Sequence, residues 1–399
     1  MWTPLLDLWH TPPLVRARER LELDDEAIVR SQIAVSEIAA PTGEEKERGA
    51  WIAQRFRALG LQDVRVDAVG NVIGRRAGAQ AGAPVVICAH LDTVFPRATP
   101  VTVQRSGNRL TGPGIGDNGR GLAVMLALAA AIDGRAVRPV APIDFVATTG
   151  EEGVGDLRGA KQAFAGPMRS ARAAIALDGA GDERIVHRAL GSRRYRVAFR
   201  GPGGHSWSAY GVPNPIHAAA VAAAALARLP LPHLPRTTLS VCRMGGGLSV
   251  NAIPGEGWLD LDVRSTSADA LDLVEREVYE AARAALDEEN VRRTRGAPPL
   301  SYAITCIGNR PGGETPADHP LVAMAVEATH LVGREPELAT ASTDANIPIS
   351  CGIPAIAIGA GGRGGDAHTA AEWFDNTDGR LGVARALGVI LGAASGITA

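Results

Sequence analysis

Short, largely apolar runs punctuate this chain at residues 84–89, 143–147, 173–177 and 354–358. Runs of this length, without a regular alternation of polar residues, are typical of strands that are buried on both faces of a sheet. Helix-like segments lie between them, for example at residues 121–132 and 321–331. Buried strands that alternate with helices predict an α/β domain with a central sheet and flanking helices.

A different pattern occupies the middle of the chain. Residues 194–199, 237–243 and 258–264 have strand character, and residues 215–229 and 268–290 have helix character. This β-α-β-β-α order predicts an antiparallel sheet backed by helices, that is, an α+β domain of ferredoxin-like type. We therefore predict a split α/β domain, residues 1–191 and 309–399, that carries an inserted domain at residues 192–308.

Size and charge narrow the class of protein. The chain has 399 residues, whereas a single hydrophobic core serves at most roughly 250–300 residues, so we expect two domains. Lys and Arg number 41 and Asp and Glu 43, so charge gives no reason to expect nucleic acid or an anionic membrane as a partner.

The four cysteines form no CxxC pair, and we expect them to be reduced core residues of a cytoplasmic protein. No apolar stretch free of charges and breaks is long enough for a membrane-spanning helix.

A helix start is predicted shortly after residue 42. Thr42 and Glu45 have the spacing of a capping box, in which the two side chains accept backbone N–H groups at a helix N-terminus. We therefore expect Thr42 to be the N-cap of a helix that ends near Leu59, before Gly60.

Side chains that can bind metals follow the predicted strands, at the point where each strand ends. Ligands bind outside the carboxyl ends of the strands in an open α/β sheet, so these groups are expected to meet at one edge. Imidazole and carboxylate groups without thiolates suit zinc, manganese or cobalt. A further carboxylate lies in the glycine-rich turn at residues 114–118, directly before a predicted helix. Each residue alone is usually structural, but their joint occurrence predicts a metal site. The candidates are His90, Asp92, Asp117, Glu151, Glu152, Asp178 and His368.

Seven short motifs in a fixed order resemble a known family. They are AHLDTV at 89–94, GIGDN at 114–118, TGEEG at 149–153, LDG at 177–179, GGHS at 203–206, STDAN at 342–346 and AHT at 367–369. On these motifs, which span nearly the whole chain, the sequence resembles the co-catalytic zinc exopeptidases, a family that includes peptidase T, carboxypeptidase G and the aminoacylases. The likeness is greatest to peptidase-T-like members.

The resemblance implies two divalent metal ions per chain, zinc or else cobalt or manganese. It makes Asp117 a carboxylate that bridges both metals. His90 and Asp178 would complete one metal site, and Glu152 and His368 the other. The resemblance also implies a cis peptide bond directly after Asp117.

The same resemblance implies roles for three further residues. Glu151 would be the general base, and Asp92 would accept the second ring N–H of His90 and so fix its tautomer. The inserted domain would act as a lid and dimerisation domain. From there, His205 would reach across a homodimer and stabilise the oxyanion that forms in the neighbouring site.

Candidate substrate-binding residues are less well defined. Asn251 and Arg264 lie in the insertion at the spacing that the family uses for substrate binding, and Arg310 follows it. A guanidinium suits a terminal carboxylate of the substrate, although a surface salt bridge is an open alternative. Asn346 could orient a substrate amide or could hold a turn.

The predicted function is a metal-dependent exopeptidase that acts on small peptides. The same chemistry would serve an N-acyl amino acid deacylase, and a noncatalytic metal-binding or peptide-binding protein of this fold is the alternative from another class. The presence of Glu151 beside all five ligand candidates favours an enzyme, because metal binding alone does not require a general base. The expected assembly is a homodimer without nucleic acid or membrane.

Overall fold

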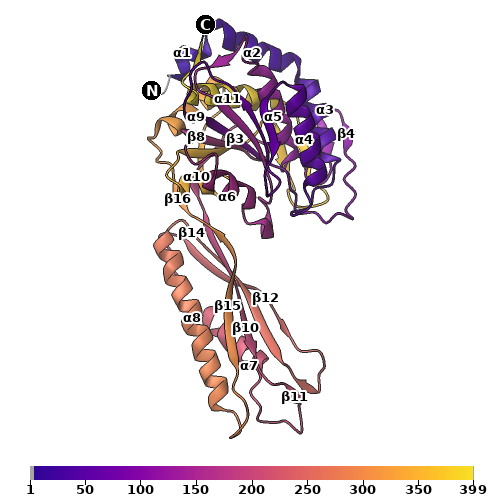
Figure 1. Ribbon diagram of the computed structural model, residues 1–399, viewed down its shortest axis with the longest axis vertical. Coiled ribbons are helices and arrows are strands. Elements are labelled where there is room, and N and C mark those ends of the chain that lie inside the picture. The colour runs from indigo at the N-terminus through magenta and orange to yellow at the C-terminus, as the bar shows by residue number, and fades with distance from the viewer. Residues whose placement is uncertain (1–3, 399) are drawn as a thin grey trace. The chain divides into compact units, whose positions relative to one another are not determined.

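The computed structural model describes residues 4–398, which fold into two compact units (Figure 1). Unit 1 contains the described residues up to Ala189 and from Glu314 onward, and unit 2 is the stretch Leu190–Gly313. Each unit has a hydrophobic core of its own. The α/β architecture with an inserted α+β unit is the fold class that the sequence predicts.

Unit 1 is built on a sheet whose central strands are parallel and buried. Strands β7 (Ile143–Thr148), β3 (Val85–His90), β8 (Ala173–Leu177) and β18 (Ala355–Ile358) are neighbours in that order. One edge is extended by the antiparallel strands β2 (Val72–Arg76) and β1 (Gln62–Val66). At the other edge lie β9 (Arg184–Ala189), β16 (Gly313–Glu314) and β17 (Glu337–Ala341). Smaller sheets comprise β4 (Gln104–Ser106), β5 (Arg109–Thr111), β19 (Arg363–Gly365) and β20 (Trp373–Asp375), and separately β6 (Arg138–Pro139) and β21 (Ile397–Thr398).

Helices cover both faces of the central sheet because successive strand residues point to opposite sides. Val85 and Ile87 belong to the larger cluster, whereas Val86 and Cys88 belong to the smaller one. The larger cluster is covered by α1 (Leu5–Trp9), α2 (Pro12–Leu23), α3 (Asp25–Ser36), α4 (Lys46–Ala58), α5 (Gly119–Ala131), α9 (Pro320–Leu331) and α11 (Gly379–Ala393). The smaller one is covered by α6 (Arg158–Ala165) and α10 (Asn346–Ser350). Within residues 4–398, none of these helices is long and apolar enough to cross a bilayer.

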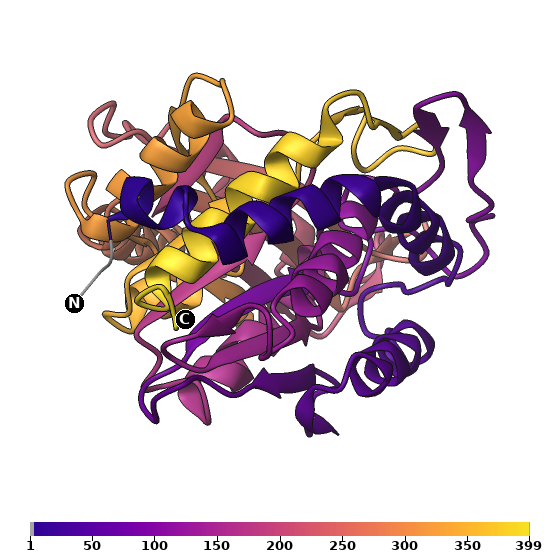
Figure 2. The same cartoon turned by 90° about the horizontal axis from the view of Figure 1, so that it is seen from above.

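A buried arginine joins helix α5 to the C-terminal part of unit 1, where α11 lies beside α2 and α5 (Figure 2). The Arg120 guanidinium donates to the carbonyl oxygens of Ala360 at 2.8 Å and Gly379 at 3.1 Å, and it lies 4.8 Å from the ring centre of Phe374. Burial lowers the pKa of Arg120 to about 10, which still leaves the guanidinium charged at neutral pH.

Unit 2 has the order of a ferredoxin-like fold. Strands β10 (Gly191–Arg200), β12 (Thr237–Gly246), β14 (Glu256–Ser265) and β15 (Ser301–Arg310) form an antiparallel sheet in the order β12-β14-β10-β15. Helices α7 (Pro215–Leu226) and α8 (Ala268–Val291) pack on it around a core that includes Phe199, Leu259 and Val278. A short ladder of β11 (Gly204–His205) and β13 (Ala252–Ile253) lies in the same unit.

Two local expectations are wrong. Helix α4 begins at Lys46 with Glu45 as its N-cap, so Thr42 does not cap it. The Thr42 hydroxyl donates to Asp92 instead, because the turn before the helix packs against the end of β3. The cysteines are free thiols, but only Cys88 is buried in the core; Cys242 and Cys306 are exposed because they lie on the two edge strands of the unit 2 sheet.

Replacement of Arg120 by Met is expected to destabilise unit 1 by about 2 to 4 kcal/mol, because two buried carbonyl oxygens lose a charged donor. Urea denaturation followed by circular dichroism measures this change. Arg57→Met, at an exposed position of α4, is the matched control and should leave the midpoint unchanged. Equal midpoints for the two variants would contradict the role given to Arg120.

Candidate metal centre

Neighbouring strand ends bring the candidate ligands together in unit 1. His90 is the last residue of β3, and Asp178 directly follows β8. Glu151 and Glu152 lie in the loop that follows β7. Because β7, β3 and β8 are adjacent and parallel, their carboxyl ends lie at one edge of the sheet, as the sequence predicts.

A tight turn presents Asp117 to the same edge. Asn118, which is fully buried, caps helix α5 by accepting the backbone N–H of Gly121 at 3.1 Å. Its side chain also donates to the carbonyl oxygen of Leu177 at 2.8 Å, which ties the turn to the end of β8. The peptide bond between Asp117 and Asn118 is cis, which confirms the bond geometry implied by the family resemblance.

The two carboxylate oxygens of Asp117 face different histidines. Its Oδ1 lies 2.9 Å from His90 Nε2, and its Oδ2 lies 3.2 Å from His368 Nε2. On the second side, His368 Nε2 is also 2.8 Å from Glu152 Oε1. On the first side, His90 Nε2 is 4.0 Å from Asp178 Oδ1. The residues thus form two groups that share Asp117.

Burial and mutual repulsion disfavour the charged forms of the carboxylates at this edge. Burial, together with the nearby Asp117 carboxylate, raises the pKa of Asp178 to about 7 and also raises the pKa of Glu152. The hydrogen bond to Asp117 is the largest of the effects that raise the pKa of His368 to about 9. A divalent cation would remove this repulsion, and the ligand atoms of His90, Asp117 and Glu152 all lie within 4.8 Å of one another. The donor set therefore fits zinc or a similar ion.

The contact that orients His90 differs from the one expected. The ring Nδ1–H of His90 donates to the backbone carbonyl of Asp92 at 3.0 Å, whereas the Asp92 carboxylate is 3.7 Å away. This carbonyl still fixes the tautomer that leaves Nε2 facing the site. The Asp92 carboxylate instead accepts the backbone N–H groups of Glu151 at 2.9 Å and Glu152 at 3.0 Å. Asp92 therefore positions the loop of the proposed general base as well as His90.

Glu151 is buried beside the ligand groups, with 6 % of its surface exposed. Its charge contributes to raising the pKa of His90, against the effect of burial, so its carboxylate acts on the site electrostatically. The loop is also held from the N-terminal side, because Glu45 accepts the backbone N–H of Gly150 at 3.0 Å and pairs with Arg158 at 2.7 Å. Sequence reasoning assigned Glu45 to a helix cap and missed this contact.

Glu372 supports the candidate site, and the sequence did not predict this. Its buried carboxylate accepts three backbone N–H groups of the Asp117 turn, from Gly114, Gly116 and Asp117, each at 2.8 Å. It follows His368 by four residues in the loop between β19 and β20. One short segment therefore supplies a candidate ligand and holds the turn of a second one. The only sequence signal is an acidic residue directly before the apolar pair at residues 373–374.

Two of the candidates in unit 2 lie together. His205 forms part of the β11–β13 ladder, and the backbone N–H of Ser206 donates to the carbonyl of Asn251 at 3.0 Å. The exposed His205 ring accepts the backbone N–H of Trp207 through Nδ1 at 3.2 Å, which leaves Nε2 available as a donor. The structure thus places both residues at one corner of unit 2.

Of the remaining three candidates, Arg264 and Arg310 lie on the two strands that flank β10, both opposite Ser192, whereas Asn346 lies in unit 1. Arg264 pairs with Asp262 at 2.7 Å, which is the salt-bridge alternative left open by the sequence. Arg310 is buried at the end of β15. Asn346 lies in unit 1, is fully buried, and accepts the backbone N–H of Thr343 at 2.9 Å. This contact corresponds to the turn role for Asn346.

An α/β sheet that gathers imidazoles and carboxylates at its carboxyl edge, with a ferredoxin-like insertion, defines a hydrolase of the metallopeptidase class. The chain belongs to peptidase family M20/M25/M40, whose family model matches residues 86–391. This membership confirms the resemblance seen in the motifs.

The individual proteins described next have low sequence identity to this chain. The chain is similar to a probable carboxypeptidase from Aspergillus terreus, with 25 % identity over 271 residues that cover 61 % of this chain and 62 % of that protein. Its fold is similar to that of aminopeptidase PepT from Bacillus cereus, with a TM-score of 0.72, 22 % identity, and coverage of 92 % of this chain and 98 % of the other. A dinuclear metal-binding M20 peptidase from Bacillus subtilis gives a TM-score of 0.68 at 17 % identity, with coverage of 93 % and 98 %. At these identities the two solved structures show a common fold.

Glu372→Gln is expected to weaken zinc binding about 10- to 100-fold, because the –NH₂ group that replaces one carboxylate oxygen cannot accept the backbone N–H groups on its side of the Asp117 turn. Titration against a competing chelator measures the affinity, and the absorption spectrum of the cobalt-loaded protein reports the geometry. Glu335→Gln, at an exposed position, is the matched control. A folded Glu372→Gln protein with wild-type affinity and spectrum would show that the turn does not depend on Glu372.

Proposed function

We propose that this protein is a two-metal exopeptidase that hydrolyses an amide bond of small peptides. The observation that carries the proposal is the Asp117 carboxylate, whose two oxygens face His90 and His368 separately. A carboxylate in this position can bridge two cations. Membership of the M20/M25/M40 family and the fold shared with an aminopeptidase and with a dinuclear metal-binding peptidase support it.

Five residues would hold the metals, and zinc is the ion that we propose. His90 and Asp178 would bind one ion. Glu152 and His368 would bind the other, with Asp117 shared. When bound, two such cations polarise the scissile carbonyl group and lower the pKa of a water molecule toward about 7.

Glu151 is the proposed general base. As water attacks the carbonyl carbon, the Glu151 carboxylate takes a proton from that water. The same proton then passes to the amide nitrogen as the C–N bond breaks, so that an acid and an amine are released. The hydrogen bonds of Asp92 to the Glu151 and Glu152 backbone hold the base in place while this transfer occurs.

We also propose that the protein is a homodimer in which His205 of one chain acts on the substrate of the other. His205 lies at a corner of unit 2 that carries exposed apolar side chains, among them Trp207 and Tyr210, each 87 % exposed. Exposed apolar side chains in adjacent turns favour burial against another surface. His205 Nε2 would donate a hydrogen bond to the oxyanion that forms when water attacks.

Substrate recognition is proposed to involve Asn251 and Arg264 of the same unit, with Arg310 as a further candidate. Asn251 lies next to the His205 ladder, so both residues would meet the substrate together. Arg264 shares Asp262 with Arg194, and a substrate carboxylate could take the place of Asp262. A terminal carboxylate occurs in peptides and in N-acyl amino acids, so these residues do not separate the two substrate classes.

The proposed location is the cytoplasm. All four cysteines are free thiols, and Cys242 and Cys306 are exposed. Exposed thiols persist in a reducing compartment, whereas disulfides are typical of oxidising ones.

Removal of the metals with a chelator should abolish hydrolysis, and zinc, cobalt or manganese should restore it. Amine release from dipeptides, tripeptides and N-acyl amino acids identifies the substrate class. If the metals restore hydrolysis of N-acyl amino acids alone, the protein is the deacylase. If the metal-loaded protein hydrolyses none of these substrates, the noncatalytic metal-binding or peptide-binding protein is the remaining alternative.

Glu151→Gln should retain two metals per chain but lose about 10²- to 10⁴-fold in turnover, because Gln has a similar volume but cannot take a proton. Elemental analysis and single-turnover rates on the same preparation measure both quantities. Glu327→Gln on α9 is a control that should keep full activity. A fully metallated Glu151→Gln protein with near-normal turnover would require another base.

The role of His205 across the dimer can be tested by mixing two inactive variants. His205→Ala chains and Glu151→Gln chains, after subunit exchange, form mixed dimers in which one site has both groups intact if the site is shared. Activity should then return to about half of the wild-type value per mixed dimer. Proven mixed dimers without recovery would refute action across the dimer.

A further inference from the structure

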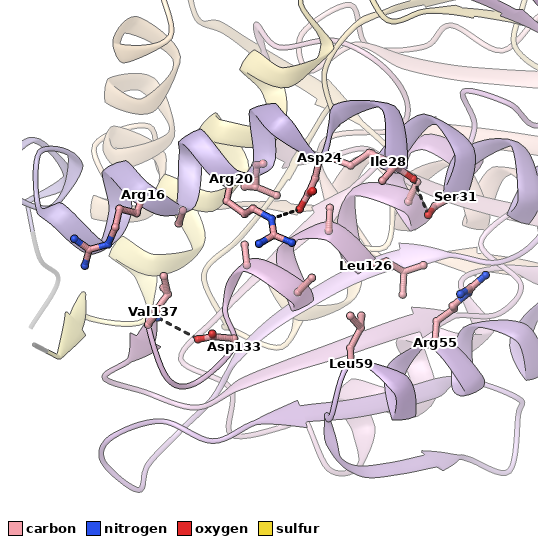
Figure 3. A pocket seen from close by; sticks show the side chains of 18 of the residues that line it. Arg16, Arg20, Asp24, Ile28, Ser31, Arg55, Leu59, Leu126, Asp133 and Val137 are labelled. Atoms are coloured by element: carbon pink, nitrogen blue, oxygen red, sulfur yellow. Dashed lines mark hydrogen bonds and ion pairs between the residues drawn. The ribbon is translucent and has the colours of Figure 1, made fainter.

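Unit 1 contains a hollow that shares no residue with the candidate metal centre (Figure 3). Its volume is about 600 Å³. Helices α2 and α3 form one wall, the end of α4 and residues 133–137 form the other, and α5 forms the floor. A volume in this range is typical of sites for small molecules rather than for whole helices.

The floor and lower walls of this groove are apolar. Leu21, Ile28 and Leu126 line it from three different helices, together with Leu59 and Val137. The outward positions of α5 are small, because Ala123, Ala127, Ala130 and Ala131 line the same hollow. An apolar body would therefore find a continuous surface from which to exclude water.

The groove is lined by more positively charged than negatively charged side chains. Arg20 is paired with Asp24 at 2.6 Å, and Asp133 accepts the backbone N–H groups of Arg135 and Val137. Both carboxylates of the groove thus have partners. Arg16 and Arg55 line it as well, and within residues 4–398 neither has a carboxylate partner. The Arg55 guanidinium lies 4.8 Å from the ring centre of Trp51, which limits its range of positions.

The two arginines lie toward opposite ends of the groove, with Leu126 and Leu59 on the Arg55 side (Figure 3). Apolar surface between two unpaired guanidinium groups matches an amphipathic anion. We propose that this groove binds a small carboxylate with an apolar chain, such as a medium-chain fatty acid. The chain lies over the alanines of α5, and the carboxylate accepts hydrogen bonds from Arg55 or Arg16.

An acidic amphipathic helix of another protein is the alternative occupant. The groove favours the smaller ligand, because its volume of about 600 Å³ is that of a small-molecule site. This site is independent of the proposed peptidase activity, since none of its residues is a candidate ligand, base or substrate-binding residue.

Binding of decanoate to the metal-loaded protein, below the micellar concentration and measured by isothermal titration calorimetry, tests the proposal. We expect saturable binding of one decanoate per chain and no comparable binding of decylamine. Of Arg16→Glu and Arg55→Glu, the variant that loses the guanidinium bound to the carboxylate should weaken binding about tenfold, since it removes a charged donor and adds a repulsive carboxylate at that end of the groove. Ala130→Trp should abolish binding by filling the exposed part of the groove.

Arg57→Glu is the matched control, because Arg57 is an exposed arginine on the same helix as Arg55 but does not line the groove. It should bind decanoate as the wild type does. If decanoate binds equally well to Arg16→Glu, Arg55→Glu and Ala130→Trp, it binds elsewhere, for instance at the metals. That result would overturn the proposal. Absence of decanoate binding, or saturable binding of an acidic helical peptide in its place, also overturns it.

Discussion

Three carboxylates and two imidazoles crowd one edge of the unit 1 sheet, and the surrounding structure serves to hold them there. Repulsion from Asp117, added to burial, raises the pKa of Asp178 to about 7, so the ligand groups would separate if their backbones were free. Two of the ligand loops are fixed by side chains distant in sequence. Glu372 holds the Asp117 turn, and Asp92 holds the Glu152 loop.

These supports form a connected set that begins outside the ligand loops. Thr42 donates to Asp92, Asp92 accepts from Glu151 and Glu152, and Glu45 accepts from Gly150 in the same loop. The turn before α4 is therefore part of the site, although it contributes no ligand. A substitution there should act on the position of Glu151 rather than on metal affinity alone, because the contacts reach the loop through its backbone.

The sequence predicts the ligand candidates better than their supports, and the reason is physical. His90 ends one buried strand and Asp178 follows another, and the apolar runs of such strands can be recognised locally, while their ends must meet in a parallel sheet. The contacts of Glu372 with Gly114 and Gly116 span more than 250 residues of chain, and no local pattern specifies such a pairing. The capping-box spacing at Thr42 was misleading for the same reason, since a distant partner competed successfully with the local helix cap.

The abundance of alanine and glycine accounts for both the close packing and the groove around α5. At its start, Gly119 lies so close to the Ser36 hydroxyl that a β-carbon there would clash, and this contact brings α3 against the Asp117 turn. Farther along α5, Ala127 and Ala130 present only methyl groups toward the same wall of helices, and these methyl groups do not fill the space. Small side chains thus permit contact where the helices converge and leave a hollow where they do not. The outward alanines of α5 can accordingly change without altering the inward face, where Leu122 and Met125 are completely buried.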